Sequence, residues 1–166
     1  FSGWFRKSII TAKNTEKVVK SCGREESMFP VYEEKKKNLH IHLRTLAHAS
    51  PHLHNSIEFI YITEGTLELG MGQELYHMEE GDLAVIFPDV IHHYQVFSPG
   101  ENKAVYLWAK PVLIGQFADI IQNSCPEDPV IKKKQVHPDI VNAVRCLRAN
   151  RKEKDDNLAV EQAYVQ

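Results

Sequence analysis

The chain has 166 residues, of which 43% are hydrophobic and 25% are charged, the size and ordinary composition of one folded domain with a short extension. These proportions exclude a fully disordered chain, a collagen-like repeat and a membrane-spanning protein. Lysine and arginine number 20 against 22 for aspartate and glutamate, so the formal charge of -2 argues against nucleic-acid binding by this segment alone.

The cysteines are few and far apart, and none forms a C-x-x-C pair; they are Cys22, Cys125 and Cys146. They predict neither a disulfide framework nor a thiolate zinc site, and they suit a reducing cytoplasm. No apolar run approaches the ~20 residues of a transmembrane helix, so we expect no membrane partner and a cytoplasmic location.

Residues 1–30 predict a loosely packed arm. Their only apolar pairs, Ile9-Ile10 and Val18-Val19, are surrounded by charged and small polar residues. An arm of this kind is a natural moving part for a binding protein.

Residues 31–110 predict an antiparallel β-barrel or sandwich. The first clear strand alternates Leu39, Ile41 and Leu43 with polar neighbours, the period of a half-buried strand. Short stretches rich in β-branched and aromatic residues follow, separated by turn residues such as Gly65. The expected strands are 39–44, 57–63, 66–71, 74–78, 83–87, 92–97 and 104–109. Such evenly spaced short strands are typical of a mainly β fold.

Residues 111–166 predict helices, because the hydrophobic period lengthens after Pro111. A first helix is expected over the apolar positions 113, 117, 120 and 121, and a second begins at Pro138, where a first-turn proline is tolerated. The second has an apolar face formed by Ile140, Val141, Val144 and Leu147. That face either packs on the barrel or forms part of a dimer interface. A third helix is expected from Leu158, and because no stop signal ends it, we expect the natural chain to continue beyond Gln166.

The candidate chemistry lies in the pattern His52-x-His54-x-x-x-Glu58. In an extended chain, residues two apart point to the same face, so these three side chains share one parity and can converge. Two imidazoles and a carboxylate are ligands for zinc, iron, nickel or manganese, and a third histidine, best supplied by His92, would complete a four-ligand site. The competing interpretation is that these residues line a pocket that holds no metal.

Two other positions are candidates for ligand contact. Arg44 shares a strand face with His40 and His42, a face that is directed either to solvent or to a pocket, and its planar fork suits an anionic ligand. Tyr94 shares the parity of His92 and either hydrogen-bonds a ligand or lies in the core. Trp108 is expected in the core.

These residues resemble the two cupin motifs. His52-x-His54-x-x-x-Glu58, followed after six residues by Gly65, matches the end of the first motif. The second motif, whose usual form is G-x5-P-x-G-x-x-H, is similar to Gly81-x5-Phe87-x-Asp89-x-x-His92. The sequence departs from the usual residues at Leu46, Phe87, Asp89 and Val96.

Within the cupins, the runs 58–65 and 81–94 resemble the sensor domain of AraC-type transcriptional regulators, and the resemblance extends from about residue 39 to 165. It implies a jelly-roll-like cupin barrel that binds a small-molecule effector, followed by helices that form a homodimer. It also implies paired helix-turn-helix units beyond this chain, through which alone DNA would be bound.

Two functions follow as hypotheses. The first is an effector sensor with or without one divalent transition metal in its barrel. The alternative is a mononuclear metal-dependent cupin enzyme, such as a dioxygenase or an isomerase, in which substrate takes an open metal position. The weak second motif, and helices that carry no catalytic pattern, argue against the enzyme.

Overall fold

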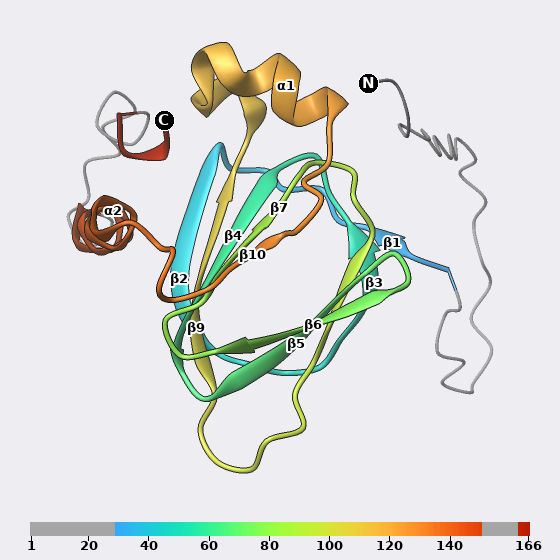
Figure 1. Cartoon of the computed structure of the whole chain (residues 1–166). Coiled ribbons are helices and arrows are strands. Elements are labelled where there is room, and N and C mark those ends of the chain that lie inside the picture. Colours follow the sequence, from blue (N-terminus) through green and yellow to red (C-terminus); the bar gives the residue numbers. More distant parts are fainter. Residues whose placement is uncertain (1–28, 151–162) are drawn as a thin grey trace, which may run out of the picture.

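The computed structural model describes residues 29–150 and 163–166, and this part of the chain is mainly β (Figure 1). The strands are β1 (Val31–Tyr32), β2 (Leu39–Thr45), β3 (Ala49–Leu53), β4 (Ile57–Glu64), β5 (Thr66–Met71), β6 (Glu74–Glu79), β7 (Leu83–Ile86), β8 (His92–Gln95), β9 (Lys103–Ala109) and β10 (Val130–Ile131). The helical elements are the 3-10 turns η1 (Pro111–Leu113) and η2 (Gly115–Phe117) and the α-helices α1 (Ala118–Asn123) and α2 (Pro138–Asn150). The predicted fold class, a β-barrel followed by helices, is confirmed.

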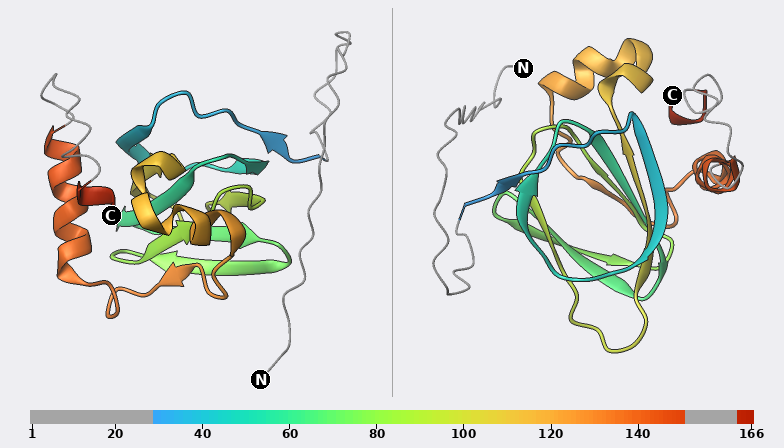
Figure 2. Two further views of the ribbon diagram at one scale, coloured as in Figure 1. Left: turned by 90° about the horizontal axis from the view of Figure 1, so that it is seen from above. Right: turned by 180° about the vertical axis from the view of Figure 1, so that it is seen from behind.

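The strands form two five-stranded sheets that face each other, with the orders β1-β3-β8-β5-β6 and β10-β7-β4-β9-β2. Every pairing is antiparallel except that of β1 with β3, which is parallel. Figure 2 shows the barrel from above and from behind, with α1 across one end and α2 beside β2.

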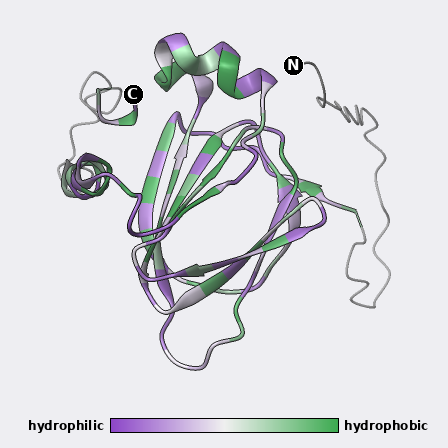
Figure 3. Cartoon of the chain, viewed as in Figure 1, coloured by the Kyte–Doolittle hydropathy of each residue, from purple (hydrophilic) through white to green (hydrophobic). Residues whose placement is uncertain are grey.

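Side chains from both sheets fill the space between them. This interior cluster consists of Leu46, Ile60, Ile62, Leu67, Leu69, Met71, Met78, Ala84, Ile86, Tyr94, Ala104, Tyr106, Trp108 and Val130. An outer cluster covers the far face of the second sheet and consists of Leu39, Ile41, Ile57, Val105, Leu107, Ala109, Leu113, Ile114 and Leu147. Strand β9 contributes alternate residues to the two clusters, which explains why its apolar run is continuous. In Figure 3, hydrophobic and hydrophilic residues are interspersed along the strands of the barrel.

The helical segment begins differently from the prediction. Instead of one helix from about residue 113, the chain makes two 3-10 turns and then the short helix α1. Gly115 interrupts it with a φ of 61°, a left-handed conformation that ends regular helix and that glycine adopts at little cost. The second helix is confirmed as α2. The predicted third helix lies largely outside the described residues, as does nearly all of the predicted arm.

Strands β1, β3 and β10 were absent from the predicted set. Strand β3 contains Pro51, which marks the sequence as non-strand because proline cannot donate to the ladder. The register of β3 against β8 shifts between Ala49 and His52, so the proline lies at an irregularity where that hydrogen bond is not needed. Within the described residues, no helix is long and apolar enough to span a bilayer.

Asp82, in the turn between β6 and β7, ties the chain after β10 to the barrel. Its carboxylate is buried and accepts hydrogen bonds from the backbone N–H of Glu79 (3.0 Å) and of Lys133 (2.8 Å), and from Lys132 Nζ (2.9 Å). Burial alone would raise the pKa of Asp82, but these donors together lower it.

We therefore expect Asp82→Asn to reduce the free energy of unfolding by about 2 kcal/mol at pH 7. The hydrogen bonds to the side chain lose the contribution of its negative charge, and at least one donor then faces the NH2 group of the asparagine, which cannot accept from it. Because the pKa of Asp82 is lower in the folded protein, its contribution is present above the ordinary carboxyl pKa of about 3.9 and is lost as the pH falls below it. Urea unfolding at pH 7 and pH 3 measures this. Glu80→Gln, in the same turn but exposed, is the control and should change stability by less than about 0.5 kcal/mol.

Candidate metal centre

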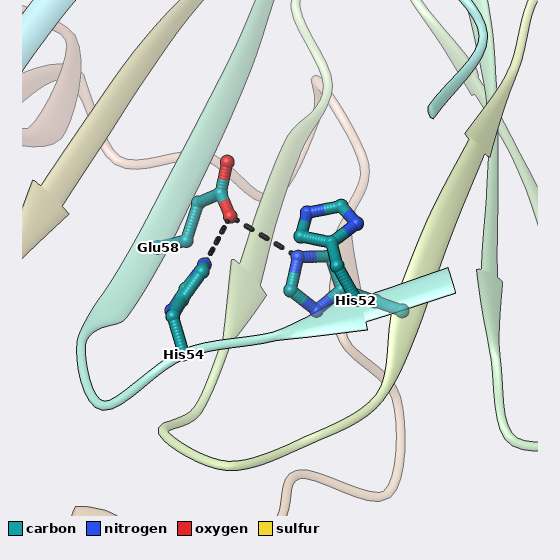
Figure 4. A group of neighbouring side chains, drawn as sticks. His52, His54 and Glu58 are labelled. Atoms are coloured by element: carbon teal, nitrogen blue, oxygen red, sulfur yellow. Dashed lines mark hydrogen bonds and ion pairs between the residues drawn. The ribbon is translucent and has the colours of Figure 1, made fainter. Parts of the chain in front are cut away.

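Four buried side chains converge at one end of the barrel interior: His52, His54, Glu58 and His92. Their ligand atoms all lie within 4.8 Å of one another. His52 is on β3, His54 on the link to β4, Glu58 on β4 and His92 at the start of β8. Figure 4 shows His52, His54 and Glu58 pointing toward one another.

The sheet register explains this convergence. His52 and His92 are direct partners across β3 and β8, and their ring centroids are 4.2 Å apart. Glu58 lies on the inward face of β4 together with Ile60 and Ile62 of the interior cluster, because alternate residues share a face. The predicted convergence of His52, His54 and Glu58 is observed, but the chain bends between β3 and β4, so it does not follow from the alternation of one extended strand.

Backbone carbonyls fix which nitrogen of each ring faces the centre. The Nδ1 atoms of His52, His54 and His92 lie 2.8 to 2.9 Å from the carbonyl oxygens of Ser50, Ser56 and Val90 respectively. A carbonyl oxygen only accepts, so each Nδ1 must donate. In a neutral ring the proton is then on Nδ1, and the Nε2 lone pair is directed to the shared centre, as metal-binding histidines require.

This arrangement brings acceptors together without donors. Glu58 Oε2 lies 2.8 Å from His54 Nε2 and 3.2 Å from His92 Nε2. In the described part of the chain, neither Glu58 Oε1 nor His92 Nε2 has a hydrogen-bond partner, although both are fully buried. Buried lone pairs that face one another are costly unless a proton or a metal ion lies between them. The donor set therefore fits a cation.

The pKa shifts keep these groups in the forms that bind metal. Burial alone would raise the pKa of Glu58, but when His54 and His92 carry a proton on Nε2, their hydrogen bonds to the carboxylate outweigh burial and hold the pKa well below its usual range. Burial lowers the pKa of His52, and the neighbouring His92 lowers it further. At neutral pH the site thus presents an ionised carboxylate and a neutral His52. Imidazole nitrogens with one carboxylate suit zinc, iron, nickel or manganese.

A cavity of about 500 Å³ opens directly onto this cluster, and both His52 and Glu58 form part of its lining. Its inner wall is aromatic, formed by Tyr94, Tyr106 and Trp108. In the described residues, Tyr94 Oη and Trp108 Nε1 are buried without a hydrogen-bond partner. Burial raises the pKa of Tyr94 well above its usual value, with Glu58 adding to the effect, so its hydroxyl keeps the proton.

The face of β2 that carries His40, His42 and Arg44 is directed to this cavity and not to solvent alone. His40 and Arg44 line it, and His42 packs edge-on against Trp108 with ring centroids 5.0 Å apart. Burial, assisted by the nearby charges of Arg44 and His40, lowers the pKa of His42 to about 4.

Sequence reasoning did not assign several residues of the cavity, among them Trp108 and Lys35. Trp108, expected in the core, belongs to the interior cluster but also lines the cavity, and its inward parity with Tyr106 was a usable signal. Lys35 lies in the segment between β1 and β2, where no periodic pattern marks it, and its Nζ is 4.1 Å from the centroid of the Trp108 ring.

Two departures from the usual cupin motifs have a structural explanation. Asp89 has a φ of 61°, the left-handed conformation in which the motif's glycine is at ease and which aspartate tolerates better than most residues. Its N–H donates to the carbonyl oxygen of His54 (2.8 Å), so it fixes the link between β3 and β4 that carries this ligand. Leu46 is buried in the interior cluster, where its side chain fills space that the motif's glycine would leave empty.

Comparison with known proteins supports the fold. Residues 40–110 match the profile of the cupin domain. The chain is similar in structure to a cupin-2 domain containing protein from Shewanella frigidimarina, with 20% identity and a TM-score of 0.39 over 44% of this chain and 72% of that one. It is also similar to AerE from Microcystis aeruginosa (19% identity, TM-score 0.45, 58% of this chain and 44% of that one) and to apo ToxT from Vibrio cholerae (10% identity, TM-score 0.48, 80% and 54%).

No curated protein matches the sequence. The profile match agrees with the two facing sheets of the barrel and with the motif residues gathered in its interior. Residues 40–110 of this chain therefore have the cupin fold.

Proposed function

We propose that this chain is the effector-sensing and dimerisation part of an AraC-type transcriptional regulator, acting in the cytoplasm and holding one divalent transition metal ion in its barrel. The observation that carries the binding role is the open cavity adjoining a buried set of four metal ligands. The regulator role rests on the likeness of the runs 58–65 and 81–94 to that family. Residues 1–30, 31–110 and 111–166 are the proposed arm, barrel and helical segment.

Strand β2 offers a physical connection between the cavity and the helices. His40 and Arg44 line the cavity, whereas Leu39 belongs to the outer cluster, which also contains Leu147 of α2. A ligand that shifts β2 would therefore also change the packing of α2 in the outer cluster. Binding changes the protein's state only if the ligand has different affinities for the two arrangements.

The downstream gene sequence tests the regulator role. If the proposal is right, the open reading frame continues past Gln166 and encodes paired helix-turn-helix patterns. A stop codon directly after Gln166 would contradict it and would favour the enzyme. Sequencing of the genomic locus or its transcript decides between them.

We also propose that the sensor is a homodimer that uses α2. The apolar face of this helix is divided: Leu147 is 2% exposed and packs in the outer cluster, with Val144 packed against it, whereas Val141 is 38% exposed. Leu147 thus serves the core of this chain, and Val141 is available to a second copy.

Accordingly, Val141→Glu should weaken the dimer at least tenfold without unfolding the barrel, because a charge would be buried in the interface but not in the core. Sedimentation velocity over a range of concentrations measures this. Val112→Glu is the matched control, since Val112 is an exposed valine that lies on η1 and not on α2. A dimer unaffected by Val141→Glu would place the interface elsewhere.

The alternative is a mononuclear metal-dependent cupin enzyme, a dioxygenase or an isomerase. It is favoured by one observation: the ligands His52 and Glu58 line the cavity, so a bound molecule can reach a metal at this site. The metal would supply Lewis acidity there, and the residues of this chain would position the substrate.

A further inference from the structure

The charged groups around the cavity are unequally partnered. Three acids line it: Glu58 belongs to the metal cluster, Glu33 pairs with Lys35 at 2.5 Å, and Glu34 is the third. Arg44 has no acidic partner in the part of the chain that the structure describes, and Lys36 and Lys37 are further cations on the same lining. A metal ion at the cluster would add more positive charge.

The two cations nearest the aromatic wall lie against the same indole. Lys35 Nζ is 4.1 Å and Arg44 Cζ is 5.4 Å from the centroid of the Trp108 ring. The ring face attracts both, but it carries no net charge and cannot neutralise them. Arg44 also lines the cavity, and a guanidinium matches a carboxylate with two parallel hydrogen bonds.

The wall behind these cations offers hydrogen-bond donors and flat apolar surface. Tyr94 Oη and Trp108 Nε1 are buried and unpartnered within the described residues, and both residues line the cavity. Tyr106 stacks with Trp108, their centroids 6.0 Å apart. Unpaired donors favour a ligand that carries acceptors, and an aromatic wall favours a flat, unsaturated body.

We propose that the cavity selects a small organic anion, a carboxylate with an aromatic or other planar body. Its carboxylate pairs with Arg44 beside Lys35, and its body lies along Trp108 and Tyr106 toward the donors of the inner wall. This inference rests on the proposed function, since it takes the cavity as the effector site. Arg44 is the residue that sets the preference for anions, and Trp108 sets the preference for planar bodies.

Benzoate, benzamide and cyclohexanecarboxylate are suitable probes, because they separate charge from planarity at nearly constant size. Binding is followed by the fluorescence of Trp108 in a Trp4→Phe background, which leaves a single tryptophan. We expect benzoate to bind at least tenfold more tightly than either of the other two. Arg44→Met should weaken benzoate at least tenfold and leave benzamide unchanged, whereas Arg145→Met, which removes an exposed arginine of α2, should change neither.

Three results would each contradict the proposal of an anionic ligand. They are equal affinity for benzoate and benzamide, benzoate binding that is unchanged in Arg44→Met, and no binding of any probe. These results are independent of the test of the proposed function. A reading frame that stops after Gln166 would contradict the regulator role but would not affect an Arg44-dependent benzoate site. A cavity that prefers neutral probes would contradict the anionic ligand but would not affect the regulator role.

Discussion

His54→Ala is expected to abolish metal binding, reducing the metal content of the purified protein from about one equivalent to less than about a tenth, since the site loses one of its four ligands and the imidazole nearest its carboxylate. His54 is the ligand closest to Glu58, with Nε2 2.8 Å from Oε2, and its Nδ1 is fixed by the carbonyl of Ser56. Its loss removes one ligand and frees the carboxylate from its main partner. Elemental analysis of protein purified without chelators measures the metal.

A histidine outside the cluster provides the control. His77 has an acidic neighbour at a comparable distance, with Nδ1 2.5 Å from Glu68 Oε1, but it is exposed on the outside of the barrel. His77→Ala should leave one equivalent of metal bound. Metal-free wild-type protein with a well-ordered barrel would refute the metal centre, and the four residues would then be a pocket lining.

The sequence was most informative where periodicity and burial agree. The spacing of His52, His54 and Glu58 identified three of the four clustered ligands, although the chain bends between β3 and β4 and the three do not share one strand. His92 lies on a distant strand, so it could be named only as the best candidate for a further histidine, which its place in the motif-like run Gly81 to His92 then supported. The pairing of β3 with β8 places His52 opposite His92. The periodicity of a single strand does not show which strand it pairs with, so this contact could not be predicted.

Features that depend on tertiary contact could not be predicted. The alternation of Leu39 and Ile41 indicated a half-buried strand, but the apolar face is on the outside of the barrel, under Leu113 and Leu147, while His40 and Arg44 face the cavity. The position of Lys35 over Trp108 joins a segment without periodicity to a strand far along the chain. Such contacts are set by packing between sheets and by loop closure, which leave no local signature.

The second large effect is on stability: removal of metal should lower the melting temperature by roughly 10 °C. Free metal at a hundredfold excess over its dissociation constant stabilises the folded state by about 2.7 kcal/mol, and each kcal/mol shifts the melting temperature of a domain of this size by about 4 °C. In the metal-free protein, the facing lone pairs of Glu58 and the histidines are uncompensated, so the cluster weakens the interior that it occupies. Scanning calorimetry of metal-loaded and chelator-dialysed protein gives the difference directly.

The dependence of this difference on pH identifies its source. The pKa of His52 is lower in the folded protein than in the unfolded chain, so below about pH 6.5 the unfolded chain binds a proton that the folded protein resists, and stability falls as the pH falls. Protons then compete with metal for the same Nε2 lone pair, so the metal-induced rise in melting temperature should shrink over this range and be absent near pH 4.

Glu58→Gln keeps the shape of the side chain but removes its charge, and it should lose most of the metal-induced rise in melting temperature at pH 7. A rise of equal size in Glu58→Gln and wild type would show that the metal stabilises the protein from somewhere other than the barrel.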